Sequence, residues 1–161
     1  MSMQQILDAV RSFDGVLVVE PAPGGPFPEL AWGDAFFYHA PDGRMPERTQ
    51  PYGTIVTKDY PDDTASRLDE PGRYRVNVHV DRATFRRVTG EDPRSLAVHR
   101  DFTAVDVLGP HPVYGPNGWL AVVNPSETFD ELVALLRAAH EAARRRTARL
   151  GARRGKGVER A

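Results

Sequence analysis

The sequence predicts an α+β domain in which an antiparallel or mixed sheet has helices packed on one face. Three observations favour this class. Residues 73–80 alternate polar and apolar side chains, as a strand with one buried face does. Residues 2–13 and 126–140 carry apolar side chains at helical spacing, so we expect a helix near each end of the domain. Short β-branched runs between them, such as 16–20 and 119–123, predict further strands.

The first helix is expected to start after Ser2, because Ser2 and Gln5 form a capping-box pattern. Gly15 is suited to end it. A strand over residues 16–20 should follow. Residues 21–28 hold four prolines and two glycines, so neither helix nor strand can form there and a loop is expected.

The middle of the chain reads as strands separated by turns. Residues 29–40 predict a hairpin with its turn at Gly33–Asp34. A strand is expected over residues 52–59, and the polar residues 60–72 should be irregular. Residues 73–80 form the clearest strand, because their apolar and polar positions alternate without interruption.

The last third should contain further helices and one more strand. Asp81 can cap a helix that ends at Gly90. A short helix is expected over residues 101–108, and a strand over residues 119–123. Ser126 is the expected cap of the final helix, which carries its apolar residues on one stripe.

The chain has the size of one domain, and its charge is unevenly placed. We expect residues 1–145 to form a single domain, and residues 146–161 to be a basic helix end and disordered tail. Residues 144–161 carry a formal charge of +7, whereas residues 1–143 carry −8. A body at −8 repels phosphate, so nucleic acid could bind only through the tail. The alternative is a solvated helix end whose arginines complement the helix dipole.

Several function classes find no support in the sequence. The chain has no cysteine, which excludes disulfides, thiolate metal sites and a thiol nucleophile. Its five histidines lack metal-binding spacing, and Asp62–Asp63 reads as a solvated turn, so we expect no metal and no cofactor. Ser66 lacks the surroundings of a nucleophile elbow. No membrane helix or signal peptide is apparent, so a cytoplasmic location is expected.

Three segments resemble a known family: Trp32–Tyr38 (Trp-Gly-Asp-Ala-Phe-Phe-Tyr), Tyr52–Tyr60, and His111–Pro125 with its Pro-Val-Tyr-Gly loop and Trp strand. Together they resemble an uncharacterised actinobacterial domain-of-unknown-function family over residues 1–145. The arrangement is more distantly similar to the MmcQ/YjbR-like proteins. That resemblance implies an antiparallel α+β fold, and DNA binding has been suggested for those proteins on fold grounds. No catalytic residue carries over from either family.

The polar side of the 73–80 strand supplies the main candidate site. Period-two geometry places Arg75, Asn77 and His79 on one surface. If neighbouring strands pair with it, His39 and Asp59 could converge with His79. Such a set could bind an anion or work as a His–Asp acid/base pair. The alternative is the solvated face of an antiparallel sheet.

The loop over residues 111–119 supplies the second candidate. Tyr114 and Trp119 give rigid contact area with a polar group, as binding loops require, and Pro112 and Pro116 would hold them in place. The alternative is structural, with Trp119 buried under the final helix.

Three functions follow from these candidates. The preferred hypothesis is a non-catalytic binding module for a small molecule or a protein, with Arg75, Asn77 and His79 as polar contacts and Tyr114 and Trp119 as an aromatic wall. The second is an enzyme acting on an anionic small molecule, in which Asp59 orients His79 as a general acid/base and Arg75 holds the anionic group. The third is nucleic-acid binding through the basic tail.

Overall fold

The computed structural model describes residues 2–159, and the side chains of residues 2–151. A six-stranded antiparallel sheet forms its centre, with the strand order β1-β2-β3-β4-β6-β5. The strands are β1 (Val16–Val19), β2 (Ala35–His39), β3 (Gly53–Val56), β4 (Arg75–His79), β5 (Gly109–Pro110) and β6 (Trp119–Val123). The helices that pack against it are α1 (Met3–Arg11), α2 (Arg82–Thr89) and α3 (Phe129–Glu159). The predicted α+β class and antiparallel sheet are confirmed.

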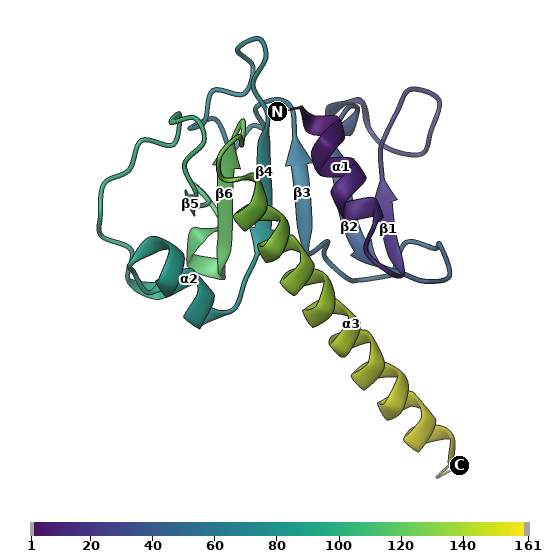
Figure 1. The fold of residues 1–161 in the computed structure, drawn as a ribbon. Coiled ribbons are helices and arrows are strands. Elements are labelled where there is room, and N and C mark those ends of the chain that lie inside the picture. Colours follow the sequence, from purple (N-terminus) through teal and green to yellow (C-terminus); the bar gives the residue numbers. More distant parts are fainter. Residues whose placement is uncertain (1, 160–161) are drawn as a thin grey trace.

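The helices and the sheet share one apolar core. Figure 1 shows α1 in front of β1 and β2, and α3 running across the same face of the sheet. Phe85 of α2 joins this core, and the Arg87 side chain of α2 lies 3.7 Å from Glu131 of α3. The most deeply buried core residues are Ile6, Val10, Ala35, Phe37, Ile55, Val76, Val78, Phe85, Leu120, Leu132 and Leu136.

The alternation that predicted β4 is confirmed. Val76 and Val78 face the helices and are fully buried. Gly53 pairs with Val78 across β3 and β4, and a Cβ atom at Gly53 would lie only 2.9 Å from a methyl group of Leu136. A glycine at this position therefore lets α3 approach the sheet closely.

Several predicted boundaries agree with the structure. The N–H of Ser2 donates to Oε1 of Gln5 at 2.9 Å, as a capping box requires. Asp81 caps α2 by accepting a hydrogen bond from Thr84 N at 2.7 Å, and Gly90 ends that helix in the left-handed conformation at φ 78°. The last strand begins at Trp119, as expected.

Three local predictions were wrong. Residues Glu29–Ala31 form a 3₁₀ turn, so the expected hairpin does not form there, and β2 pairs with β1 instead. The expected helix over 101–108 is an irregular segment. Ser126 was expected to cap the final helix, but α3 starts at Phe129. The carboxylate of Asp106 instead accepts the three backbone N–H groups of residues 126–128, just before the helix.

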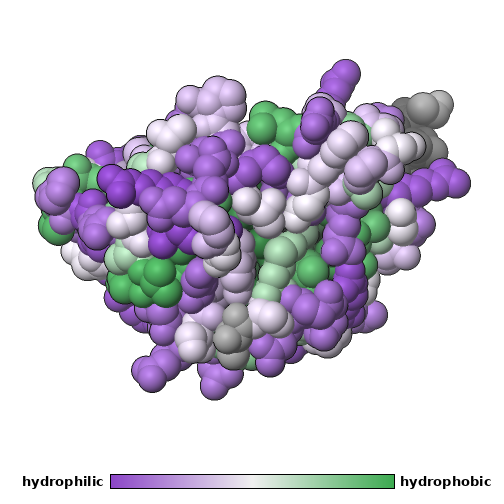
Figure 2. All heavy atoms as spheres, turned by 90° about the horizontal axis from the view of Figure 1, so that it is seen from above, coloured by the Kyte–Doolittle hydropathy of each residue, from purple (hydrophilic) through white to green (hydrophobic). Residues whose placement is uncertain are grey.

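Surface hydrophobic side chains are scattered. On the face shown in Figure 2, they form small separate patches between hydrophilic residues. The described residues include exposed valines near the β5 edge, namely Val98, Val105 and Val107.

Candidate functional site

The polar row of β4 is buried rather than exposed. Arg75 and Asn77 are only 1% and 3% exposed. Residues 57–74 and 98–114 cover this side of the sheet, because side chains from both segments contact Arg75. Both expectations for this surface, an open binding face and a solvated one, were therefore wrong for Arg75 and Asn77.

Arg75 is the centre of a polar network. Its Nη1 donates to Asp63 Oδ1 and to Ser66 Oγ, both at 3.0 Å. Its Nη2 donates to Asp63 Oδ2 at 2.5 Å, and its Nε donates to Asn77 Oδ1 at 2.8 Å. The fifth N–H faces His111 Nε2 at 2.9 Å. A guanidinium has five N–H groups, so none is left for a ligand.

The charge of Arg75 lowers the pKa of its partner Asp63. Burial raises the pKa of Asp63, but the hydrogen bonds and the charge of Arg75 outweigh burial and hold that pKa below its ordinary value. Asn77 in turn donates to Thr54 Oγ1 at 2.9 Å. The ion pair thus stays charged inside the protein, with its remaining polar atoms bonded to neighbouring side chains.

His111 is held in its neutral form. Its Nδ1 accepts the N–H groups of Val113 at 3.0 Å and Tyr114 at 2.9 Å, while its Nε2 faces Arg75. Because Nδ1 accepts these two N–H groups, the neutral ring carries its proton on Nε2, and an imidazolium would place a second N–H against the Val113 and Tyr114 donors. Burial lowers the pKa of His111 from its ordinary 6.5, and the Arg75 charge lowers it further.

The expected convergence of His39, Asp59 and His79 does not occur. His39 faces the helices, and its ring centroid lies 5.2 Å from that of His140 in α3. Val56 pairs with Arg75 and Gly53 with Val78, so Asp59 follows the opposite end of β3 from the one beside His79.

Asp59 has a structural role instead, since its carboxylate accepts the N–H of Leu68 at 2.8 Å. Asp59 and His79 therefore do not form the acid/base pair on which the enzyme hypothesis depended.

The remaining candidates form two separate contacts. His79 and Trp119 are paired across β4 and β6, with ring centroids 5.6 Å apart, and His79 Nε2 lies 3.1 Å from the Asn117 carbonyl oxygen. Burial lowers the pKa of His79, although its bond to Asn117 opposes this. Tyr114 is 46% exposed, and its ring packs against His111 at 5.0 Å. Trp119 thus packs against His79 and Tyr114 against His111, so the two rings do not form the single aromatic wall that was expected.

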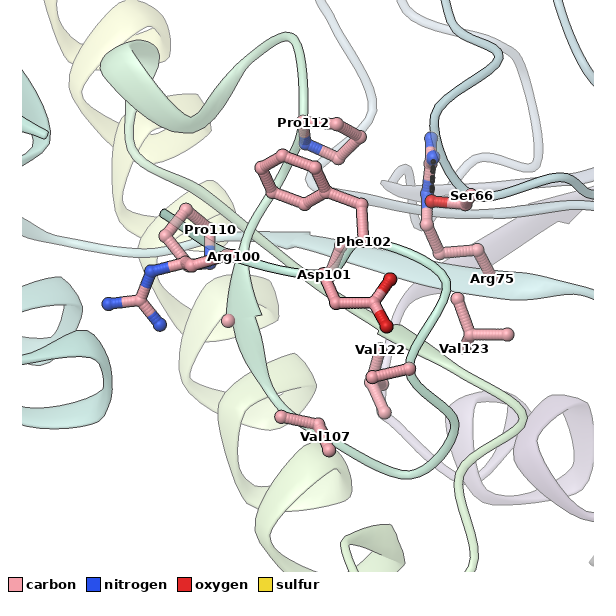
Figure 3. A pocket seen from close by; sticks show the side chains of 13 residues that line it. Ser66, Arg75, Arg100, Asp101, Phe102, Val107, Pro110, Pro112, Val122 and Val123 are labelled. Carbon is pink, nitrogen blue, oxygen red and sulfur yellow. Dashed lines mark hydrogen bonds between the residues drawn. The ribbon is translucent and has the colours of Figure 1, made fainter. Parts of the chain in front are cut away.

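A pocket opens beside the Arg75 network. It has a volume of about 210 Å³ and lies between residues 100–112 and the strands β4 and β6. Its apolar lining comes mainly from Phe102, Ala104, Val107, Pro110, Pro112, Ala121, Val122 and Val123, and its polar lining from Ser66, Arg75, Arg100 and Asp101. In Figure 3, Arg75 and Ser66 lie at one side, and the guanidinium of Arg100 lies at the opposite side.

A second pocket of about 210 Å³ adjoins the first. Arg100, Phe102, Pro110 and Pro112 line both. His111 and Val98 belong to the second pocket. Of the sequence candidates, Arg75 lines the first pocket, whereas Trp119, Tyr114 and His79 line neither of these two pockets.

The sequence reasoning missed Asp63, Ser66, His111 and Arg100 as site residues. Asp63 was expected in a solvated turn, yet it pairs with a buried arginine. A buried arginine requires a carboxylate partner, but the alternation of β4 does not show that its polar side is covered. The sequence could not show which of its 22 acidic residues provides that partner.

A second buried carboxylate lies where two of the resemblance segments meet. Asp34 accepts hydrogen bonds from Thr57 N at 2.9 Å, Thr57 Oγ1 at 2.7 Å and Lys58 Nζ at 3.1 Å. The hydroxyl of Tyr60 also donates to it. Burial raises the pKa of Tyr60, and the bond to Asp34 raises it further. These donors saturate the carboxylate, so the cluster ties the end of β3 to the start of β2.

Other site classes find no support among the described residues. Within residues 2–151, whose side chains are described, no group of three or more His, Asp or Glu side chains is placed to hold a metal ion. No helix in that part of the chain is long and apolar enough to cross a membrane.

Comparison with protein families gives one match. Residues 1–153 match the model of a family described as "Family of unknown function (DUF6194)", and the chain belongs to that family. Comparison with curated proteins gives no match, and comparison with solved structures gives none either. The resemblance to a domain of unknown function is thus confirmed, while the one to the MmcQ/YjbR-like proteins stays a prediction.

Proposed function

We propose that this chain is a non-catalytic binding module, and that its ligand is a small molecule held in the pocket between residues 100–112 and β6. The pocket has the character of small-molecule sites, which are concave and mostly apolar with a few fixed polar groups. The Arg75 network supports one side of it, and its hydrogen bonds to Asp63 and Ser66 hold that side rigid. A preformed site loses little conformational entropy when a ligand binds.

One observation carries the proposal. The Nε–H of Arg100 is buried and has no hydrogen-bond partner among the described residues. Buried polar groups are nearly always bonded, so this donor calls for an acceptor. Arg100 lines both pockets, and its Nη2 is held by Thr89 O at 2.8 Å and Glu91 Oε2 at 3.0 Å. Nη2 therefore fixes the side chain, and we assign the buried Nε–H to an acceptor atom on a ligand.

The charges around the pocket favour a neutral ligand. Arg75 is paired with Asp63, and Arg100 is paired with Glu91. Asp101 adds a negative charge at the lining. A highly charged anion would meet no free cation here, so the ligand class is a small, mainly apolar molecule that carries one hydrogen-bond acceptor.

A small ligand is favoured over a protein partner. Protein interfaces have a large, well-packed apolar centre, whereas the hydrophobic patches in Figure 2 are small and separate. The lining residues Phe102, Pro110 and Pro112 instead surround two hollows.

Binding of acetophenone, measured by NMR titration, tests this function. α-Methylstyrene is the matched probe, since it has the same shape without the carbonyl acceptor. One hydrogen bond to Arg100 contributes about 1 kcal/mol, so acetophenone should bind about 5-fold more tightly.

Two tryptophan substitutions locate the site. Val107 is 56% exposed and lines the first pocket, whereas Val105 is 49% exposed and does not. Val107→Trp should fill the opening and weaken acetophenone binding at least about 10-fold, while Val105→Trp should leave it unchanged. Equal effects of both substitutions, or no saturable binding by the native chain, would contradict the proposal.

A further inference from the structure

The C-terminal half of α3 leaves the body of the protein. The helix runs for 31 residues, and its first half packs on the sheet through Leu132, Leu136 and His140. Residues 144–150 are all exposed. Figure 1 shows this part of α3 extending well beyond the sheet. At 1.5 Å per residue, the segment from Arg144 to Glu159 projects by about 24 Å, and we call it the arm.

The arm is strongly basic. Residues 144–161 have a formal charge of +7, against −8 for residues 1–143. Arg145, Arg149, Arg153 and Lys156 follow one another at spacings of four, four and three residues. These spacings place the four positions on one face of a helix. The arm therefore presents a row of cationic residues along its length.

The arm has little to stabilise it as an isolated helix. Like charges four residues apart repel each other, and Gly151, Gly155 and Gly157 are poor helix formers. Within the described side chains of the arm, the ion pair is that of Arg144 with Glu141, at 2.9 Å. An anionic partner that neutralised the row would remove the repulsion and stabilise the helix.

We propose that the arm binds the phosphate backbone of double-stranded nucleic acid. Six of its seven basic residues are arginine, whose planar fork matches phosphate oxygens, and a single α-helix fits the major groove. The acidic body repels the same polyanion, so contact is confined to the arm and reads no base sequence.

A membrane surface fits the arm less well. Interfacial helices carry a face of large apolar residues opposite the basic one. The arm has Leu150 and Val158 as its large apolar residues, and its other non-basic positions are mostly alanine and glycine. This inference is independent of the pocket, because the arm and the pocket share no residue.

Fluorescence anisotropy with a labelled 20-base-pair DNA duplex, measured from 50 to 200 mM NaCl, tests the proposal. The variant Arg145→Gln/Arg149→Gln/Arg153→Gln removes three charges, and glutamine keeps the helix propensity of arginine. Each phosphate contact adds about 0.9 to the slope of log K against log salt, so the slope should fall by about 2.7. The affinity at 100 mM should fall by as much as about 500-fold.

The matched control removes the same charge from the body. Arg44, Arg48 and Arg94 are exposed, and Arg44→Gln/Arg48→Gln/Arg94→Gln should leave both slope and affinity nearly unchanged. The arm lies outside the core, so both variants should keep the native melting temperature. Three outcomes overturn the proposal: no salt-dependent duplex binding, equal losses in both variants, or tighter binding to phosphatidylserine vesicles than to the duplex.

Discussion

Removing the carboxylate of Asp63 should destabilise the fold far more than its position in an irregular segment suggests. Arg75 is fully buried and depends on Asp63 for its charge balance, with two N–H···O bonds at 3.0 and 2.5 Å. Breaking a buried ion pair from one side costs about 3–5 kcal/mol, because the remaining charge is left uncompensated. Asp63→Ala should therefore lower the free energy of unfolding by about 4 kcal/mol.

The assay is urea unfolding followed by circular dichroism, with thermal melting beside it. Unfolding entropy is about 2.1 cal/mol/K per residue, so 4 kcal/mol corresponds to a fall in Tm of about 12 °C for 161 residues. Asp62→Ala is the matched control, since Asp62 is the exposed neighbour and should change stability by less than about 0.5 kcal/mol.

A double-mutant cycle separates the ion pair from other effects of the substitution. In an Arg75→Met background, Asp63→Ala should cost at least about 2 kcal/mol less than it does in the native chain. If Asp63→Ala and Asp62→Ala lower the free energy of unfolding equally, Asp63 does not stabilise a buried charge. The same follows if the free-energy loss of Asp63→Ala is unchanged in the Arg75→Met background.

Two further predictions concern His111 and Gly53. The native His111 has a lowered pKa, so below pH 6.5 the unfolded chain binds a proton that the native chain does not, and stability falls by about 1.4 kcal/mol per pH unit. Between pH 7 and pH 5, the free energy of unfolding measured in urea should fall by about 2 kcal/mol more in the native chain than in His111→Asn. Equal falls in the two chains would contradict a neutral His111 in the folded protein. Gly53→Ala places a Cβ atom 2.9 Å from Leu136, so it should lower the free energy of unfolding by about 1–3 kcal/mol. Gly151→Ala in the exposed part of α3, where a Cβ atom would meet nothing within 4 Å, should not lower it. Equal unfolding free energies for these two alanine variants would show that α3 can move away from the sheet without cost.

The sequence predicted the strands and helices whose apolar positions repeat regularly. β4 and the start of α1 follow from such patterns, and so does the opposite orientation of Val76 and Arg75. His39 follows three consecutive aromatic residues, Phe36 to Tyr38. Because polar and apolar residues do not alternate there, the sequence does not show which face of β2 His39 occupies.

The site could be predicted only in part, because loops build most of it. Arg75 and Asn77 were recognised as a shared polar row, but residues 57–74 and 98–114 carry no periodic signal that shows where they fold back. Their positions depend on contacts between residues that are far apart in the sequence, such as Asp63 and Arg75, which are twelve positions apart. A covered polar row and an exposed one therefore look alike in the sequence.

A crystal structure of the chain soaked with acetophenone would show whether the pocket beside Arg100 binds a small molecule. We expect the ring to lie between Phe102 and Val107, with the carbonyl oxygen within hydrogen-bond distance of Arg100 Nε and the Arg75–Asp63 pair unchanged. Acetophenone bound instead against His79 and Trp119, or an Arg75 side chain turned toward solvent, would contradict this expectation.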